Sequence, residues 1–325
     1  MANIEVYLFG AAIVDAVARP VGPDVFSRDS TPAEHIALST GGDALNEATV
    51  LSRLGRRAAL RTTLGDDGAA RFIRAHAARE GIALDAATLA GVPTGVNLVL
   101  VDPAGERHFV TDPGSTLRRF TLEDALAALD TDAFRQARIA TLASLFVSPQ
   151  LGISEMACLI GRCRAAGKLT CADSTRAKHG ETARALSPVL SQLDWFFPNA
   201  SEAAVLTGET DPEAIARALL YAGAGHVALK LGGEGCLIAD GDGLARVPAM
   251  PGVRAVDSTG AGDTFAAAFQ CALLEGRAPV ECAAFANAAA SVCVEHVGAT
   301  EAEMDREEIG RRMERVMGNT LSVNS

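Results

Sequence analysis

Short apolar runs alternate with amphipathic stretches along most of the chain. The run "IEVYLFG" at residues 4–10 ends in glycine and predicts a buried strand, and "RAALRTTLG" at 57–65 predicts another. Helical periodicity closed by glycine predicts helices over 41–55 and 66–81. After residue 120 the two patterns alternate, with strands expected at 137–143, 168–173, 193–198 and 226–232 and helices at about 149–167, 181–192, 200–207 and 212–223. This alternation predicts a doubly wound α/β fold, in which helices cover both faces of a mostly parallel sheet.

Two polar segments near the amino terminus break this rhythm. Residues 11–40 lack a helical period and contain three prolines, and residues 94–112 alternate as two strands around an Asp-Pro-Ala-Gly turn. We expect these segments, about 11–40 and 94–115, to form a small β lid. A hairpin around 241–243 and helices at about 260–276, 279–296 and 304–317 complete the chain. No repeat or linker divides it, so residues 1–325 are interpreted as one domain with a lid.

Composition narrows the range of partners. The 325 residues carry a formal net charge of −11 and only three lysines, which argues against a nucleic-acid or anionic-membrane surface. The seven cysteines include no Cys-x-x-Cys pair and are interpreted as reduced core thiols. The first residues show no signal peptide and no apolar run reaches the length of a membrane span, so we expect a cytoplasmic protein.

The stretch "DSTGAGDTF" at residues 257–265 carries the strongest candidate chemistry. The first N–H groups of a helix lack internal partners and lie at the positive end of its dipole, so glycines there let an anion approach the backbone. Gly260, Ala261 and Gly262 are therefore candidates for holding a phosphoryl group, and Asp263 for accepting a hydroxyl proton. A plain glycine turn with an ordinary first-turn acid is the alternative. Neither GxxxxGK[ST] nor GxGxxG is present, which disfavours a Walker-type NTPase and a dehydrogenase.

Five motifs together resemble the ribokinase-like (PfkB) carbohydrate kinases. "DSTGAGDTF" resembles the carboxyl-terminal signature of that family, and "GGDALNEATVLSRLG" (41–55) resembles the amino-terminal one. "FPNASEAAVLTG" (197–208) is similar to its Asn-x-x-Glu motif, "LKLGGEGC" (229–236) to its nucleotide-binding strand and turn, and "FANAAASVCVEHVGA" (285–299) to its late helix beside the adenine. The motifs occur in family order over nearly the whole chain.

The resemblance implies roles for matching residues. It makes Asp263 the base and residues 260–263 the anion hole. Asn199 and Glu202 would hold the magnesium–water shell and phosphates, although Glu202 is also a common kind of first-turn acid. The implied nucleotide contacts are Lys230, Gly232, Gly233, Gly235 and, beside the adenine, Asn287. The implied acceptor contacts are Asp15, Gly41, Gly42, Asp43 and Asn46. The cofactors implied are ATP and Mg²⁺, with K⁺ as a hypothesis whose matching positions are Asp257, Thr259, Cys293, His296 and Gly298.

Several departures from ribokinase bear on the acceptor. Asp43 stands where ribokinase-type sequences have Lys, which favours a polyol or sugar over an anion, because a carboxylate only accepts hydrogen bonds. Residues 141–149 contain no sugar-binding Glu. The stretch "ADSTRAKHG" (172–180) loosely resembles a motif of fructokinase-like and ketodeoxygluconate-kinase-like members through Asp173, which is equally suited to capping a loop.

The sequence therefore predicts ATP-dependent phosphoryl transfer to a hydroxyl of a sugar or sugar-like alcohol. Two alternatives stay open: a nucleoside kinase of the same family with adenosine-like acceptors, and a non-catalytic sugar or nucleotide sensor. Exposed lid strands often pair between protomers, so a homodimer through the lid is a further hypothesis.

Overall fold

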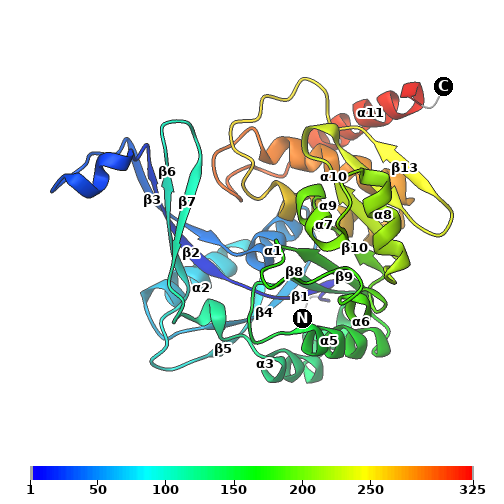
Figure 1. The fold of residues 1–325 in the computed structure, drawn as a ribbon. Coiled ribbons are helices and arrows are strands. Elements are labelled where there is room, and N and C mark those ends of the chain that lie inside the picture. Colours follow the sequence, from blue (N-terminus) through cyan, green and yellow to red (C-terminus); the bar gives the residue numbers. More distant parts are fainter. Residues whose placement is uncertain (1–2, 324–325) are drawn as a thin grey trace.

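A nine-stranded sheet forms the centre of the molecule (Figure 1). The computed structural model describes residues 3–323, and side chains up to 318. The strand order is β13-β12-β11-β10-β9-β8-β1-β4-β5, and all neighbours are parallel except the pairs that involve β12. The strands are β1 Val6–Phe9, β4 Ala58–Leu64, β5 Ala83–Thr88, β8 Ile139–Leu145, β9 Leu169–Ser174, β10 Trp195–Phe196, β11 His226–Lys230, β12 Cys236–Ala239 and β13 Leu244–Val247.

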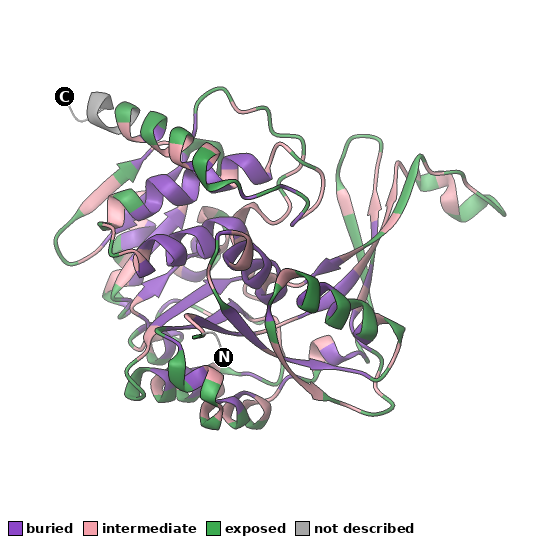
Figure 2. Ribbon diagram, turned by 180° about the vertical axis from the view of Figure 1, so that it is seen from behind, coloured by how far each residue is buried: buried purple, intermediate pink, exposed green. Residues whose placement is uncertain are grey.

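Helices pack on both faces of this sheet, which confirms the predicted fold class. Strand β1 is buried on both sides: Val6 and Leu8 belong to one hydrophobic core, and Tyr7 and Phe9 to the other. The first core is covered by α1 Asp43–Arg53, α2 Gly68–Glu80, α9 Ala261–Leu274, α10 Pro279–Cys293 and α11 Arg306–Val323. The second is covered by α3 Leu122–Ala127, α4 Asp132–Gln136, α5 Ile153–Ala165, α6 Ser187–Leu190, α7 Ala200–Thr207 and α8 Pro212–Tyr221. Figure 2 shows the buried strands between these layers.

A separate four-stranded sheet forms the lid and stands away from the main body (Figure 1). Its strands, in the order β3-β2-β6-β7, are β2 Ile13–Arg19, β3 His35–Gly41, β6 Val96–Val101 and β7 Arg107–Thr111. Strand partners share a face, so the pairs of Asp15 with Ser39 and with Asn97 define one face of the lid. The opposite face carries Leu38 and Leu98, which both pair with Ala16.

Some predicted elements differ in the structure. The strand expected at 193–198 is only Trp195–Phe196, and the helix expected at 181–192 is reduced to Ser187–Leu190. Pro188 explains the second difference, since its ring and missing N–H oppose a preceding helical turn. Edge strand β5 and the helices α3 and α4 were not predicted, and the two helices are only 6 and 5 residues long. Within the described residues, no helix is long and apolar enough to cross a membrane.

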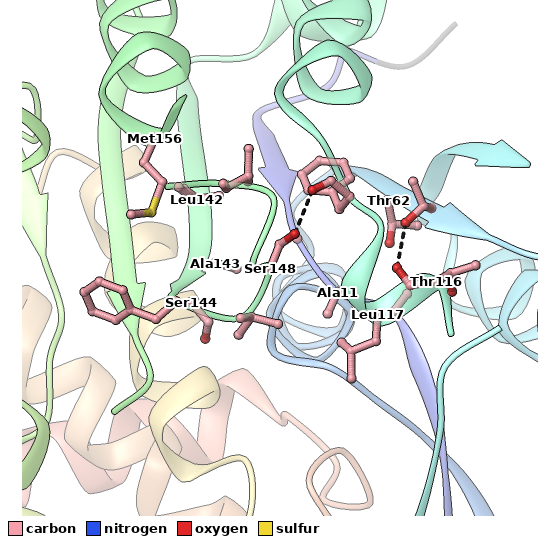
Figure 3. Close-up of a pocket in the computed structure, with 16 residues that line it drawn as sticks. Ala11, Thr62, Thr116, Leu117, Leu142, Ala143, Ser144, Ser148 and Met156 are labelled. Atoms are coloured by element: carbon pink, nitrogen blue, oxygen red, sulfur yellow. Dashed lines mark hydrogen bonds between the residues drawn. The ribbon is translucent and has the colours of Figure 1, made fainter. Parts of the chain in front are cut away.

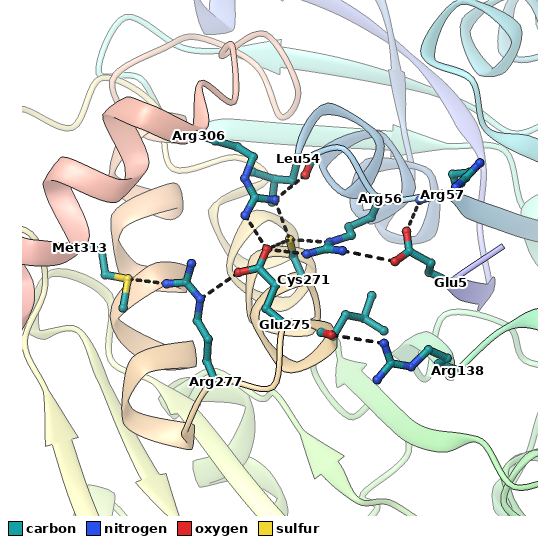
Figure 4. Close-up of polar contacts among 11 residues, drawn as sticks. Glu5, Leu54, Arg56, Arg57, Arg138, Cys271, Glu275, Arg277, Arg306 and Met313 are labelled. Atoms are coloured by element: carbon teal, nitrogen blue, oxygen red, sulfur yellow. Dashed lines mark hydrogen bonds and ion pairs between the residues drawn. The ribbon is translucent and has the colours of Figure 1, made fainter. Parts of the chain in front are cut away.

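A cluster of arginines around Glu275 joins several helix ends (Figure 4). The Glu275 carboxylate accepts hydrogen bonds from Arg56 and Arg306, and from Arg277 at 2.8 Å. Arg306 also donates to the carbonyl of Leu54 at 2.8 Å. The cluster ties the end of α9 to the end of α1 and the start of α11.

Candidate active site

The candidate site lies at the carboxyl ends of the parallel strands, where the lid faces the sheet. From β1 the chain builds the sheet first towards β4 and β5 and later towards β8, so strand order reverses between β1 and β8. Ligands of open α/β sheets bind at such a reversal. Figure 3 shows a pocket there, lined by residues that include Ala11, Leu117 and Ser144. Gly10 follows β1 and lies close to β8. A Cβ atom at that position would be 2.8 Å from the Ala143 carbonyl oxygen, so glycine allows the two chain segments to pack closely.

Helix α9 begins at this edge with unpaired backbone donors. Gly260 is its N-cap, with φ +73°, and a Cβ atom there would lie 2.5 Å from the carbonyl oxygen of Ala299. Thr264 N–H donates to the Gly260 carbonyl at 2.8 Å and Ala261 N–H to Ser258 at 3.3 Å. Across the described chain, no acceptor pairs with the N–H groups of residues 262 and 263. These free donors at the positive end of a helix dipole suit an anion.

Asp263 stands in the first turn of α9 and contacts the amino-terminal helix α1. Asn46 Nδ2 donates to Asp263 Oδ2 at 2.7 Å. Burial and the nearby Asp43 carboxylate raise the pKa of Asp263 well above its ordinary value, against the opposing effects of Asn46 and Lys230. A carboxylate with a raised pKa is a better proton acceptor, which is the property that a general base requires.

Lys230 and Asp173 form a buried ion pair beside the start of α9. Lys230 Nζ lies 2.5 Å from Asp173 Oδ2, and the two side chains are 12% and 5% exposed. Burial alone would lower the pKa of Lys230, but Asp173 and Glu202 outweigh it and raise that pKa. A Cβ atom on Gly262 would lie 3.1 Å from Lys230 Nζ, so glycine at that position lets the ammonium approach the helix start.

Asn199 and Glu202 cap helix α7 reciprocally. Asn199 Oδ1 accepts the Glu202 N–H at 2.9 Å, and Glu202 Oε2 accepts the Asn199 N–H at 3.3 Å. Ser174 Oγ also donates to Glu202 Oε2, at 3.3 Å, whereas Glu202 Oε1 has no donor among the described residues. Burial and the Asp173 carboxylate raise the pKa of Glu202 to about 7. Glu202 therefore does cap helix α7, which was the alternative to a role in binding metal. Its Oε1 atom is still available to accept a hydrogen bond or to contact a metal-bound water.

The lid places Asp15 and Asn97 opposite this edge. Asn97 Nδ2 donates to Asp15 Oδ1 at 3.0 Å, and burial raises the pKa of Asp15. Gly41 lies against this carboxylate, and a Cβ atom there would displace the Asp15 side chain. The amide oxygens of Asn46 and Asn97 are buried and have no hydrogen-bond partner within the described residues. Each asparagine thus donates to a carboxylate and leaves an acceptor that a hydroxyl can satisfy.

Asp43 begins helix α1 and faces the end of β8. Ser144 Oγ donates to Asp43 Oδ2, and Ser144 itself has φ +64°, which is unusual for a residue other than glycine. Gly42, the N-cap of α1, has φ +92°, and a Cβ atom there would lie 2.6 Å from the Ala11 carbonyl oxygen. Gly42 therefore allows close packing of α1 against the loop at Ala11.

The candidate nucleotide turn follows β11. Residues Gly232–Glu234 form a 3₁₀ turn, Gly232 has φ +59°, and a Cβ atom on Gly235 would overlap the Val247 carbonyl oxygen. A Cβ atom on Gly233 would have no neighbour within 4 Å among the described residues. Asn287 on α10 donates to the carbonyls of Val247 at 3.1 Å and Pro248 at 3.0 Å. Its amide nitrogen is thus committed to the hairpin, a structural role that the sequence did not predict.

The residues of the hypothetical monovalent-cation site lie together. Asp257 Oδ1 accepts Thr259 N–H at 2.9 Å, and Asp257 Oδ2 accepts Gly298 N–H at 2.8 Å. The Cys293 thiol donates to the Thr259 carbonyl at 3.4 Å, and His296 N–H donates to the Cys293 carbonyl at 3.1 Å.

Asp257 also forms an ion pair with Arg107 of the lid. Burial would raise the pKa of Asp257, but these hydrogen bonds and the Arg107 charge hold it below its ordinary value. Within the described residues, no cluster of three or more His, Cys, Asp or Glu could hold a metal ion.

Sequence reasoning missed Asn97, Ser144 and Arg107 as parts of this site. Asn97 did leave a signal, as the one amide inside the apolar run "VNLVLV". Ser144 and Arg107 gave none, because their partners Asp43 and Asp257 lie 101 and 150 residues away in the sequence.

Comparison with known proteins identifies the family of the chain. A family model described as pfkB family carbohydrate kinase matches residues 3–306. An uncharacterised sugar kinase of Archaeoglobus fulgidus is 30% identical over 254 residues, covering 77% of this chain and 96% of that protein. A 2-dehydro-3-deoxygluconokinase of Dickeya dadantii is 28% identical over 80% of this chain and 88% of its own. The structure of Arabidopsis thaliana ribokinase complexed with ribose and ATP superposes with a TM-score of 0.78 at 25% identity, covering 97% of this chain and 99% of that one. The chain belongs to the pfkB family of carbohydrate kinases.

Proposed function

We propose that this chain transfers the γ-phosphoryl group of ATP to a hydroxyl of a sugar or sugar-like alcohol, with Asp263 as the base. The observation that carries the proposal is the convergence of three features at one edge of the sheet. Free N–H donors of residues 262 and 263 begin α9, Asp263 carries its carboxylate at the same place, and Asn46 holds that carboxylate at 2.7 Å.

The residues divide the reaction between them. Asp15, Asn97 and Asn46 hold the acceptor through its hydroxyls. Asp263 takes the proton of the reacting hydroxyl as that oxygen bonds to the γ-phosphorus and the bond from phosphorus to the bridging oxygen of ADP breaks. The N–H groups of residues 260–263 stabilise the charge on the transferring group. Closure of the lid excludes water, which limits hydrolysis of ATP.

Asn199 and Glu202 are the residues that would hold Mg²⁺, through water and the nucleotide phosphates. Their oxygen atoms suit this ion, and Glu202 keeps one oxygen without a donor among the described residues. When bound, Mg²⁺ neutralises charge on the nucleotide phosphates. The K⁺ hypothesis is not carried into this proposal, because Arg107 already pairs with Asp257.

A neutral, hydroxyl-rich acceptor fits the site best. Three carboxylates, those of Asp15, Asp43 and Asp263, border the acceptor space, and the buried amide oxygens of Asn46 and Asn97 need hydrogen-bond donors. Relatives include proteins named ribokinase and 2-dehydro-3-deoxygluconokinase, so both neutral sugars and sugar acids belong in a test. The carboxylates favour the neutral class.

An ADP-release assay with a panel of acceptors tests the proposal. Ribose, fructose, 2-dehydro-3-deoxygluconate and adenosine should be compared with Mg²⁺ and ATP present. Turnover with a neutral sugar supports the proposal, and preferential turnover of adenosine supports the nucleoside-kinase alternative. Tight binding of a sugar or nucleotide without turnover of any acceptor would support the sensor alternative.

A homodimer through the lid is a second part of the proposal. The lid face opposite Asp15 exposes Ile36, Leu38, Leu98 and Val110 at 74%, 61%, 50% and 54%. Exposed apolar sheet faces of this kind favour association. Light scattering should give twice the chain mass, and Leu98→Asp should reduce it to one; a monomeric wild-type protein would contradict this part.

A further inference from the structure

Arg107 connects the lid to the loop that leads into helix α9. It lies on β7, pairs with Val101, and so shares the lid face of Asp15 and Asn97. Its guanidinium donates to Asp257 Oδ2, although the two residues are 150 positions apart. Burial raises the pKa of the Asp15 carboxylate, and the hydrogen bond from Asn97 and the same Arg107 charge partly offset that rise. One cation from the lid therefore faces both the acceptor acid and the acid that precedes the anion hole.

The Asp257 carboxylate holds together the two segments that flank the anion hole. It accepts from Thr259 N–H and Oγ1 at 2.9 and 2.8 Å on one segment, and from Gly298 N–H at 2.8 Å on the other. The next residue, Ala299, lies so close to Gly260 that no Cβ atom fits there. A shift of the 298–299 turn would therefore move the start of α9.

A buried carboxylate in this position needs a positive charge. The Asp257 side chain is 8% exposed and that of Arg107 is 24% exposed. Removing one partner of this partly buried ion pair leaves the other charge uncompensated, which disfavours the arrangement around it. The carbonyl of Thr259, a predicted cation ligand, faces the Cys293 thiol. In the site predicted for K⁺, Arg107 thus pairs with the Asp257 carboxylate and the Cys293 thiol hydrogen-bonds to the Thr259 carbonyl.

We propose that Arg107 is a positioning residue that supplies the positive charge at Asp257. A monovalent cation, which was predicted to supply that charge, is then not required. Closure of the lid brings Arg107 to Asp257 and so completes the anion hole. The proposal rests on the anion-hole function proposed above. When the lid opens, Arg107 leaves Asp257 and the loop loses its counter-charge. Phosphoryl transfer is then coupled to acceptor binding, because the acceptor contacts on Asp15 and Asn97 hold the same lid closed.

A series of monovalent cations at fixed ionic strength tests the proposal. For the wild-type enzyme, kcat should be equal within about twofold in K⁺, Na⁺ and tetramethylammonium chloride. Arg107→Ala should lower kcat roughly 10-fold or more in tetramethylammonium, less than the loss expected for a direct oxyanion donor. K⁺ should restore a large part of that loss, because the vacated site regains a cation. Arg19→Ala, on strand β2 of the same lid sheet, is the matched control and should show neither effect.

Thermal unfolding separates this proposal from the kinase proposal, since it needs no acceptor. K⁺ should raise the Tm of Arg107→Ala by a few degrees over tetramethylammonium and leave the wild type and Arg19→Ala unchanged. If Arg107→Ala fails to fold, Arg107→Gln takes its place. Strong activation or stabilisation of the wild type by K⁺, or an Arg107 variant that responds to cations as Arg19→Ala does, would overturn the proposal. Absence of turnover with every acceptor, with the Tm pattern as expected, would count against the kinase function alone.

Discussion

The ion pair between Lys230 and Asp173 offers a sharp test of how the site is stabilised. Lys230→Met keeps the length of the side chain but removes the ammonium. The Asp173 carboxylate, on a side chain that is 5% exposed, then lacks its counter-charge. Breaking a buried pair by removing one partner typically costs about 3–5 kcal/mol. We therefore expect the free energy of unfolding to fall by about that amount at pH 8.

The loss should depend on pH in a defined direction. Burial already raises the pKa of Asp173, and removal of Lys230 should raise it further. Above about pH 4, the pKa of Asp173 in the unfolded chain, the folded variant binds more protons than the unfolded chain. The free energy of unfolding of the variant therefore falls as pH rises, and it recovers as pH falls through the pKa of Asp173 in the folded state. Urea unfolding at pH 5.5, 7 and 8.5 should show the deficit shrinking toward acid. The double variant with Asp173→Asn should recover most of the stability at pH 8. A deficit that is small, independent of pH, or undiminished in the double variant would refute the reasoning.

Three further predictions concern other parts of the molecule. Gly260→Ala should lower kcat roughly 10²-fold, because its Cβ atom would displace the start of α9 that forms the anion hole. The control Gly276→Ala, at a residue with φ +75° and open space around it, should cost only about 1 kcal/mol of stability. Equal effects of the two variants on kcat would argue against the anion hole. Mg²⁺ should bind more tightly at pH 8 than at pH 6, because burial and Asp173 raise the pKa of Glu202 to about 7. Calorimetry on Glu202→Gln should show no such dependence of Mg²⁺ affinity on pH. A wild-type protein whose Mg²⁺ affinity is the same at both pH values would contradict the role of Glu202. Glu275→Ala should lower Tm by several degrees with little change in kcat, because three arginines lose their shared partner; an unchanged Tm would show that the cluster contributes little.

Sequence patterns predicted the parts of this molecule whose structure depends on residues close together in the sequence. The start of α9 was predicted because its glycines, its acid and the helix that follows are contiguous between 257 and 276. The central strands were predicted because burial on both faces makes them continuously apolar. Edge strand β5 was missed because its run, Ala83–Thr88, takes its strand geometry from pairing with β4.

The contacts that assemble the site could not be predicted in the same way. Asp173 lies 57 residues before Lys230, and Asp15 lies 82 residues before Asn97. Such pairs are decided by where parallel strands end and by how the lid faces the sheet. The resemblance to a kinase family supplied Lys230 and Asp15, but only the fold showed that they pair with Asp173 and Asn97.

Replacement of the carboxylate at 263 by an amide tests the central claim most directly. Asp263→Asn preserves the size of the side chain beside Asn46 and removes its capacity to accept a proton. A positioned general base contributes about 10²–10⁴-fold to rate, so kcat with the best acceptor should fall by that factor while the Kd for ATP stays near the wild-type value. Turnover at the wild-type rate would contradict the assignment of Asp263 as the base.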